Sequence, residues 1–173
     1  MKVLIYAINY APELTGIGKY AGEMAAWLAL RDHEVRVVTA PPYYPMWRVA
    51  RNYSAWRYKR GVIAGVAVWR CPLWVPKQPS ALKRLLHLAS FAASSLPVML
   101  RQIFWRPDVV LAVEPPLFCA PAAWLVARLG RAKAWLHIQD LEVDAAFELG
   151  LLPQGKLQRA ALSAERWLLR RFD

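Results

Sequence analysis

Gly16, Gly18 and Lys19 are the residues best placed to bind an anion. They follow a short apolar run at residues 2–8 and precede a helical pattern, so they fall at a helix N-terminus. Free backbone N–H groups and the positive end of the helix dipole favour phosphate there, and glycine lets a ligand approach the backbone. The pair equally fits a tight turn without a ligand. A nicotinamide or flavin site is disfavoured, because the glycines lie far from the strand end and no carboxylate follows the second strand.

Four polar residues at or just after the ends of later strands offer acid, base or hydrogen-bonding groups: Glu114, His137, Gln139 and Asp140. A carboxylate in such a position can take the proton of a sugar hydroxyl or simply bind hydroxyl groups. We predict Asp140 as the catalytic residue and the other three as substrate-binding residues. His137 and Gln139 share one strand face, and Glu114 should project into the same crevice. For His137 a purely structural role is also open.

The segment 41–48 supplies aromatic side chains, among them Tyr44, and the cation of Arg48. Aromatic rings that carry one polar atom suit half-hydrated surfaces such as those of sugars. Tyr44 is therefore a predicted substrate-binding residue. The same segment also fits a compact loop that packs its own side chains.

An alternation of strands and helices must position these residues. We predict strands at 2–8, 34–39, 62–70, 108–113 and 133–138. We predict helices at 18–31, 81–104, 117–130, 143–149 and 155–171. This order predicts an α/β fold, a Rossmann-like parallel sheet with helices on both faces, in one domain over residues 1–173. Ligands of such sheets bind beyond the carboxyl ends of the strands, where all the candidate residues lie.

The chain is strongly basic, with 23 Lys and Arg against 12 Asp and Glu and a formal net charge of +11. Its partners should therefore be anionic: phosphorylated metabolites, anionic lipid or nucleic acid. Nucleic acid is the least favoured of these, because no binding motif for it is present. Two cysteines without ligand spacing predict no metal site. A start without a signal sequence, together with these cysteines, predicts a cytoplasmic location.

Residues 85–100 carry no Asp, Glu, Lys or Arg, but the run is short for a bilayer span and contains Pro97. Basic residues flank it on both sides. This pattern fits an apolar face lying on an anionic membrane surface, and it equally fits a core helix with solvated ends.

Several stretches resemble family 4 retaining glycosyltransferases. Residues 6–20 and 33–45 look like the start of such an enzyme, while 52–58, 69–80 and 136–140 are similar to the colanic acid exopolysaccharide type, a group of fucosyltransferases. The resemblance implies a GT-B architecture of two Rossmann-like domains. This chain matches the N-terminal, acceptor-binding domain, and the C-terminal, donor-binding domain is absent from it.

The resemblance further implies a retaining hexosyltransferase with no cofactor or bound metal. A nucleotide sugar such as GDP-fucose would be the donor, and a polyprenyl-pyrophosphate-linked saccharide at the inner membrane surface the acceptor. Gly16 and Gly18 would approach the donor phosphates and the acceptor, and Asp140 would contact the acceptor hydroxyl. Gln139-Asp140 stands where many members have His-Asp. The fragment alone should be inactive. The alternative is a non-catalytic module that binds anionic membranes.

Overall fold

The computed structural model describes residues 1–139 and 155–173. These residues form a six-stranded sheet in the order β3-β4-β2-β1-β5-β6. The strands are β1 (Lys2–Tyr6), β2 (Glu34–Thr39), β3 (Lys59–Ile63), β4 (Val66–Arg70), β5 (Val109–Glu114) and β6 (Lys133–Ile138). The helices are α1 (Gly16–Ala29), α2 (Ala81–Trp105), the short 3-10 helix η1 (Leu117–Cys119), α3 (Ala120–Gly130) and α5 (Lys156–Leu169). The helix predicted at 143–149 falls outside the described residues.

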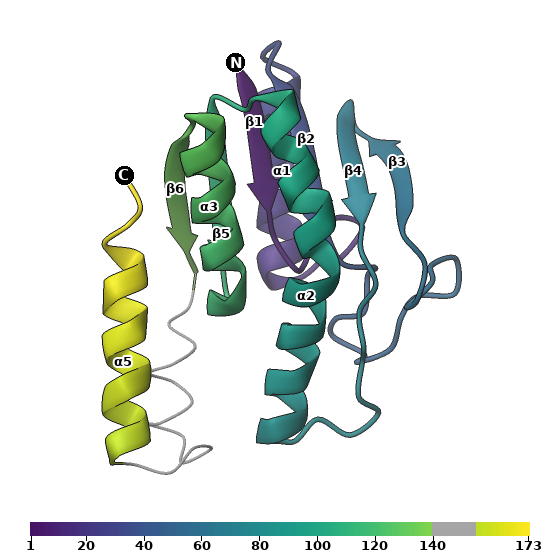
Figure 1. Cartoon of the computed structure of the whole chain (residues 1–173). Coiled ribbons are helices and arrows are strands. Elements are labelled where there is room, and N and C mark those ends of the chain that lie inside the picture. Colours follow the sequence, from purple (N-terminus) through teal and green to yellow (C-terminus); the bar gives the residue numbers. More distant parts are fainter. Residues whose placement is uncertain (140–154) are drawn as a thin grey trace.

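All neighbouring strand pairs except β3–β4 run parallel. Strand β1 pairs with β2 on one side and with β5 on the other, so the order of the parallel strands reverses beside β1. Their carboxyl ends lie at the lower end of the sheet in Figure 1. In sheets of this type, ligands bind at the reversal point beyond these ends. The predicted Rossmann-like α/β fold is confirmed.

The single strand predicted at 62–70 is wrong, because the structure has a hairpin there. Strands β3 and β4 pair antiparallel, and Ala64 and Gly65 make the turn between them with φ of 49° and 79°. Two consecutive left-handed residues suit the two-residue turns that match the twist of a hairpin. Ala64 concealed this turn, since it continues the apolar run around it. The edge strand β3 is therefore an antiparallel addition to an otherwise parallel sheet.

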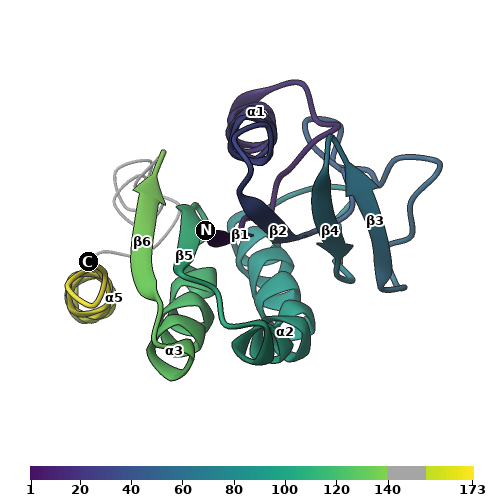
Figure 2. The ribbon, with the colours of Figure 1, turned by 90° about the horizontal axis from the view of Figure 1, so that it is seen from above.

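Helices cover both faces of the sheet, as Figure 2 shows from above. Helix α1 lies on one face, where Ala21 and Ala25 pack against Val37 and Val68. Helices α2 and α3 lie on the other face and cover the larger core cluster. Small alanines on α1 allow the helix to approach the sheet closely.

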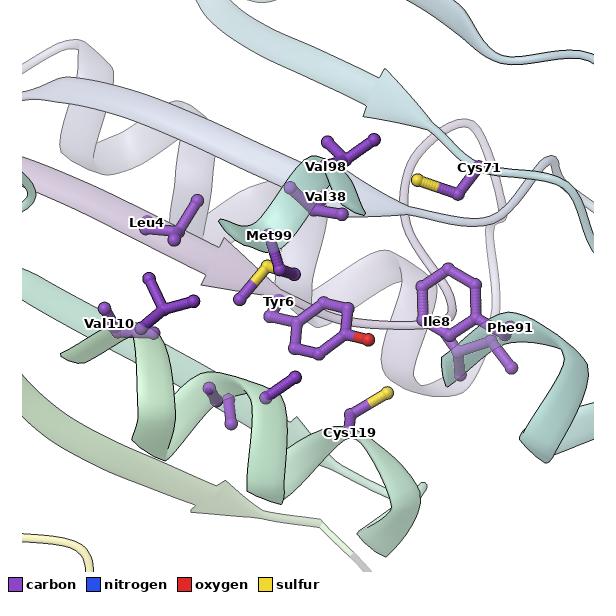
Figure 3. Close-up of a cluster of buried hydrophobic side chains, with 14 of the residues drawn as sticks. Leu4, Tyr6, Ile8, Val38, Cys71, Phe91, Val98, Met99, Val110 and Cys119 are labelled. Carbon is purple, nitrogen blue, oxygen red and sulfur yellow. The ribbon is translucent and has the colours of Figure 1, made fainter. Parts of the chain in front are cut away.

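The larger core cluster surrounds Tyr6 on β1, and Figure 3 shows Met99 and Phe91 of α2 beside it. The ring centroids of Tyr6 and Phe91 are 5.6 Å apart. Burial raises the pKa of the Tyr6 hydroxyl far above its ordinary value, and this hydroxyl lies 2.5 Å from the Ser95 Oγ. A buried hydroxyl needs such a partner, so the pair fixes α2 against the centre of the sheet.

Helix α2 is the longest element and leaves apolar side chains exposed along its outer side. Leu82, Leu86, Leu96 and Phe104 are 67%, 52%, 38% and 88% exposed. Among the helices of residues 1–139 and 155–173, none combines the length and apolarity that a membrane crossing needs.

The two outer strands differ in what lies along their free edges: exposed basic residues at β3 and residues after α5 at β6. Strand β3 begins with Lys59 and Arg60, both exposed. Beside β6, the N–H of Asp173 donates to the Ala134 carbonyl at 2.7 Å, and its carboxylate accepts from the Ala134 N–H at 2.9 Å. The Lys133 ammonium lies 3.1 Å from the same carboxylate. Residues after α5 thus lie along the outer edge of β6.

Candidate functional site

The loop after β1 leads into α1 through two glycines with different roles. Gly16 has φ of 54° and no other heavy atom near the position of a Cβ, so it needs glycine for its backbone conformation. At Gly18 a Cβ would lie 2.7 Å from the Glu13 Cβ and 2.8 Å from its Oε2. Gly18 therefore needs glycine because Glu13 packs against it.

Glu13 joins the loop after β1 to the loop after β2. Its carboxylate is buried, with 7% of the residue exposed. The Asn9 side-chain amide donates to Oε2 at 2.9 Å, and the N–H groups of Tyr43 and Tyr44 donate to Oε1 at 2.8 and 2.9 Å. Hydrogen bonds to a buried carboxylate are stronger than those between neutral groups. They hold the two tyrosines in place relative to α1.

Arg70, the last residue of β4, donates hydrogen bonds to backbone carbonyls of the same two loops. Its guanidinium donates to the Ala40 carbonyl at 2.6 Å and to the Ala11 carbonyl. It also lies over the Tyr53 ring, 4.9 Å from the centroid. Burial lowers the pKa of Arg70, while Tyr53 and Glu13 oppose this shift by favouring the charged form. Arg70 and Glu13 therefore fix the loops that follow β1 and β2.

These loops and the first turns of α2 enclose a cavity of about 330 Å³ at the carboxyl end of the sheet, which we call the glycine-loop cavity. Lining residues with polar side chains include Asn9, Thr15, Arg84 and His87, and the other lining residues include aromatic rings and the backbone of Gly16. The full lining is Ile8, Asn9, Thr15, Gly16, Ile17, Tyr43, Tyr44, Trp47, Arg84, His87, Leu88 and Pro115. Rings beside amide, hydroxyl and guanidinium groups suit a sugar hydroxyl surface with an anion nearby.

Two of the predicted site residues, Gly16 and Tyr44, line this cavity. Gly18 is buried against Glu13 instead. Lys19 lies on the exposed side of α1 and has its ammonium 4.0 Å from the Glu23 carboxylate. For Gly18 and Lys19, phosphate binding stays a prediction.

The remaining predicted residues lie at the ends of β5 and β6. Glu114 is 1% exposed, and its carbonyl accepts from the Gln139 N–H at 3.0 Å. The register pairs Val113 with His137, so these two share the face covered by α1 and the pleat places Glu114 on the opposite face. Asp140, the predicted catalytic residue, lies outside the described residues. The structure thus does not bring Glu114 and His137 to one face.

Sequence reasoning missed Glu13 and His87 as site residues and placed Arg84 only among the basic residues that flank 85–100. Arg84 and His87 are three apart on α2 and both line the glycine-loop cavity, and this spacing was the available signal. Glu13 offered no local signal, since its partners lie about 30 residues away along the chain. In the part of the chain that the structure describes, His, Cys, Asp and Glu do not gather in any group of three that could hold a metal.

Comparison with known proteins identifies the family. The glycosyl transferase 4-like domain matches residues 15–173 of this chain. The chain belongs to this family. It is also 64% identical over 156 residues to WcaI of Escherichia coli (strain K12), whose name assigns it a glycosyl transfer step in colanic acid biosynthesis. The match covers 90% of this chain and 38% of that relative, so the chain spans well under half the length of the relative.

Membership of the glycosyl transferase 4-like family agrees with the fold. The six-stranded sheet with helices on both faces is that of a Rossmann-like N-terminal domain of the GT-B type. The resemblance drawn from the sequence stretches is therefore confirmed. A non-catalytic membrane module receives no support from these matches.

Proposed function

We propose that this chain is the acceptor-binding domain of a retaining glycosyltransferase of colanic acid type exopolysaccharide synthesis. The enzyme moves fucose from GDP-fucose to a polyprenyl-pyrophosphate-linked saccharide on the cytoplasmic face of the inner membrane. The observation that carries this proposal is the glycine-loop cavity at the reversal point of the sheet, in a chain of a glycosyltransferase family. A C-terminal domain completes the cleft and binds most of the nucleotide sugar, and the enzyme needs no cofactor or metal.

The lining of the cavity supports an acceptor saccharide as its occupant. Tyr43, Tyr44 and Trp47 provide rings for the apolar face of a sugar, while Asn9 and Thr15 provide hydrogen bonds to hydroxyl groups. In the transfer, an acceptor hydroxyl oxygen forms a bond to the anomeric carbon of fucose. The bond from that carbon to the diphosphate breaks, the electron pair leaves with the diphosphate, and the hydroxyl proton passes to the Asp140 carboxylate.

The first test is a transfer assay with the full-length protein. Radiolabelled GDP-fucose, UDP-glucose or UDP-galactose is incubated with synthetic polyprenyl-pyrophosphate monosaccharides in vesicles, and label in the lipid fraction is counted. Transfer from GDP-fucose is expected. Asp140→Ala should lower the rate at least about 100-fold, because the acceptor hydroxyl loses its carboxylate partner.

Glu23→Gln is the matched control, since Glu23 is an exposed carboxylate on α1 away from the glycine-loop cavity. It should transfer at the wild-type rate. Transfer from another donor would overturn the fucose assignment alone. No transfer from any donor would overturn the proposed function, and full activity of Asp140→Ala would overturn the role of that residue.

We also propose that the outer side of α2 rests on the membrane that carries the acceptor. Its exposed Leu82 and Leu86 lie on either side of the exposed Lys83 in the sequence, and its exposed Phe104 lies between the exposed Arg101 and Arg106. Exposed apolar side chains beside cations suit the headgroup region of an anionic leaflet. The N-terminal turns of the same helix line the cavity, so this contact would present the cavity to lipid-linked saccharides.

Flotation of the full-length protein with vesicles tests this contact. Binding is expected to vesicles of phosphatidylglycerol and phosphatidylethanolamine, and not to phosphatidylcholine alone. The double variant Leu86→Ser/Phe104→Ser should bind at least about tenfold more weakly, because two apolar side chains no longer enter the interface. The control Trp27→Ser/Leu30→Ser changes one side chain of α1 and one directly after it, 52% and 83% exposed, on the opposite side of the sheet. Equal binding by both double variants would refute the contact.

A further inference from the structure

His87 is a buried histidine whose ring forms part of the wall of the glycine-loop cavity. It is 1% exposed and lies in the second turn of α2. Its ring centroid is 4.7 Å from that of Tyr43 and 5.1 Å from that of Trp47. Tyr43 and Trp47 line the same cavity, as does Arg84 one turn earlier on the helix. The histidine is therefore enclosed by the residues that would contact a ligand.

One ring nitrogen of His87 has a partner and the other has none. Nδ1 lies 2.6 Å from the Trp74 carbonyl oxygen. A carbonyl can only accept, so Nδ1 carries the proton and donates it. Burial lowers the pKa of His87 below its ordinary value, which favours the neutral imidazole at pH 7. Nε2 then keeps a lone pair, and among residues 1–139 and 155–173 this buried atom has no hydrogen-bond partner.

A buried acceptor without a donor is costly in free energy, and native proteins keep few of them. In the folded domain no described side chain donates a hydrogen bond to Nε2. A ligand N–H or O–H that reaches Nε2 would remove this cost, and the removal would add to the free energy of binding. The rings of Tyr43 and Trp47 lie beside the imidazole at the edge of the cavity, and Trp47 is only partly buried.

We propose that His87 Nε2 accepts a hydrogen bond from a hydroxyl group of the acceptor saccharide in the glycine-loop cavity. This inference rests on the proposed function and adds the residue that selects one hydroxyl of the acceptor. The chemistry favours a neutral donor, because the nearest charged group that lines the cavity is the cation of Arg84 and a second cation would be repelled. His87 is thus a positioning residue for the acceptor.

Two substitutions separate this role from a structural one. His87→Asn places its amide N–H near the position of Nδ1, so it can keep the bond to the Trp74 carbonyl while it removes Nε2. His87→Gln places a polar group near Nε2 and loses the Trp74 bond. We expect His87→Asn to raise the KM for the acceptor about tenfold with little change in kcat, the effect of one hydrogen bond. His87→Gln should raise KM less and should unfold at lower urea concentration than His87→Asn.

The deciding measurement pairs these variants with altered acceptors. The full-length enzyme is assayed with the best synthetic polyprenyl-pyrophosphate monosaccharide and with its series of monodeoxy analogues. In the wild type, loss of one particular hydroxyl should raise KM about tenfold. In His87→Asn the same analogue should cause no further rise, because the partner of that hydroxyl is already gone.

Equal penalties for every deoxy analogue in the wild type and in His87→Asn would overturn the inference. So would an effect of His87→Asn on kcat alone. In both cases the wild-type enzyme still transfers sugar, and the proposed function stands. If the wild type transfers no sugar to any acceptor, the proposed function fails first and this inference fails with it.

Discussion

Replacing Arg70 with alanine is expected to lower the free energy of unfolding by about 3–5 kcal/mol, the range for breaking a buried charged network. The guanidinium donates to the Ala40 and Ala11 carbonyls, and it is 5% exposed. Alanine would leave both carbonyls without this donor and would remove the positive charge that Glu13 faces. Urea unfolding of the full-length protein, followed by circular dichroism, measures the change.

Two further arginine variants test whether the loss of stability comes from the hydrogen bonds of Arg70. Arg70→Lys keeps the charge but cannot donate in two directions from a planar group, so an intermediate loss is expected. Arg60→Ala removes an exposed arginine that stacks on Trp69 at 4.7 Å and should cost about 1 kcal/mol or less. If Arg70→Ala and Arg60→Ala unfold at the same urea concentration, the proposed role of Arg70 is wrong.

Replacing Glu13 with alanine is expected to lower the rate of sugar transfer about 100-fold and the free energy of unfolding by about 3 kcal/mol. The carboxylate accepts from the N–H groups of Tyr43 and Tyr44 and from Asn9. All three residues line the glycine-loop cavity. Without Glu13 the loop after β2 loses its attachment to the loop after β1, and displacements of about 1 Å at a site can cost this much in rate.

Glu13→Gln is the matched variant, because it has the same shape and keeps one carbonyl oxygen for the two backbone donors. The amide nitrogen would then face the Asn9 amide, so one of the three hydrogen bonds should be lost. We expect about a tenfold loss of rate and half the loss of stability. Transfer assays and urea unfolding are run on both variants. An alanine variant that is unstable but fully active at low temperature would show that Glu13 does not shape the site.

The strands and helices were largely predictable from the sequence, since apolar runs and helical spacing are local patterns. Strands β2 and β6 and the core helix α2 lie where those patterns placed them. The turn at Ala64-Gly65 was missed, because alanine inside an apolar run carries no turn signal and its left-handed φ of 49° is uncommon for a residue with a Cβ. Local patterns therefore locate elements better than they locate the turns between similar residues.

The candidate site was predictable only where a residue lies in a connection that leaves the carboxyl end of a strand. Gly16 and Tyr44 lie in the connections after β1 and β2, and both line the cavity. His87 lies within a helix and in an apolar run, and that run indicated only a core helix or a membrane-surface helix. No pattern there marked His87 as a site residue. Glu13 acts on the backbone of a loop about 30 residues away, and such a contact exists only after the sheet has placed the two loops together. Long-range hydrogen bonds of this kind have no signature in one sequence.

The edges of the two outer strands, β3 and β6, decide whether a second copy of this domain can add to the sheet. An open strand edge offers unsatisfied N–H and C=O groups that can add strands from other molecules and so begin aggregation. Strand β3 carries Lys59 and Arg60, whose like charges would repel the same strand of a second copy. At β6 the backbone N–H and carbonyl of Ala134 are both already bound by Asp173. Neither border of the sheet is therefore a good template for another copy, so edge-to-edge pairing of strands is disfavoured at both sides of this domain.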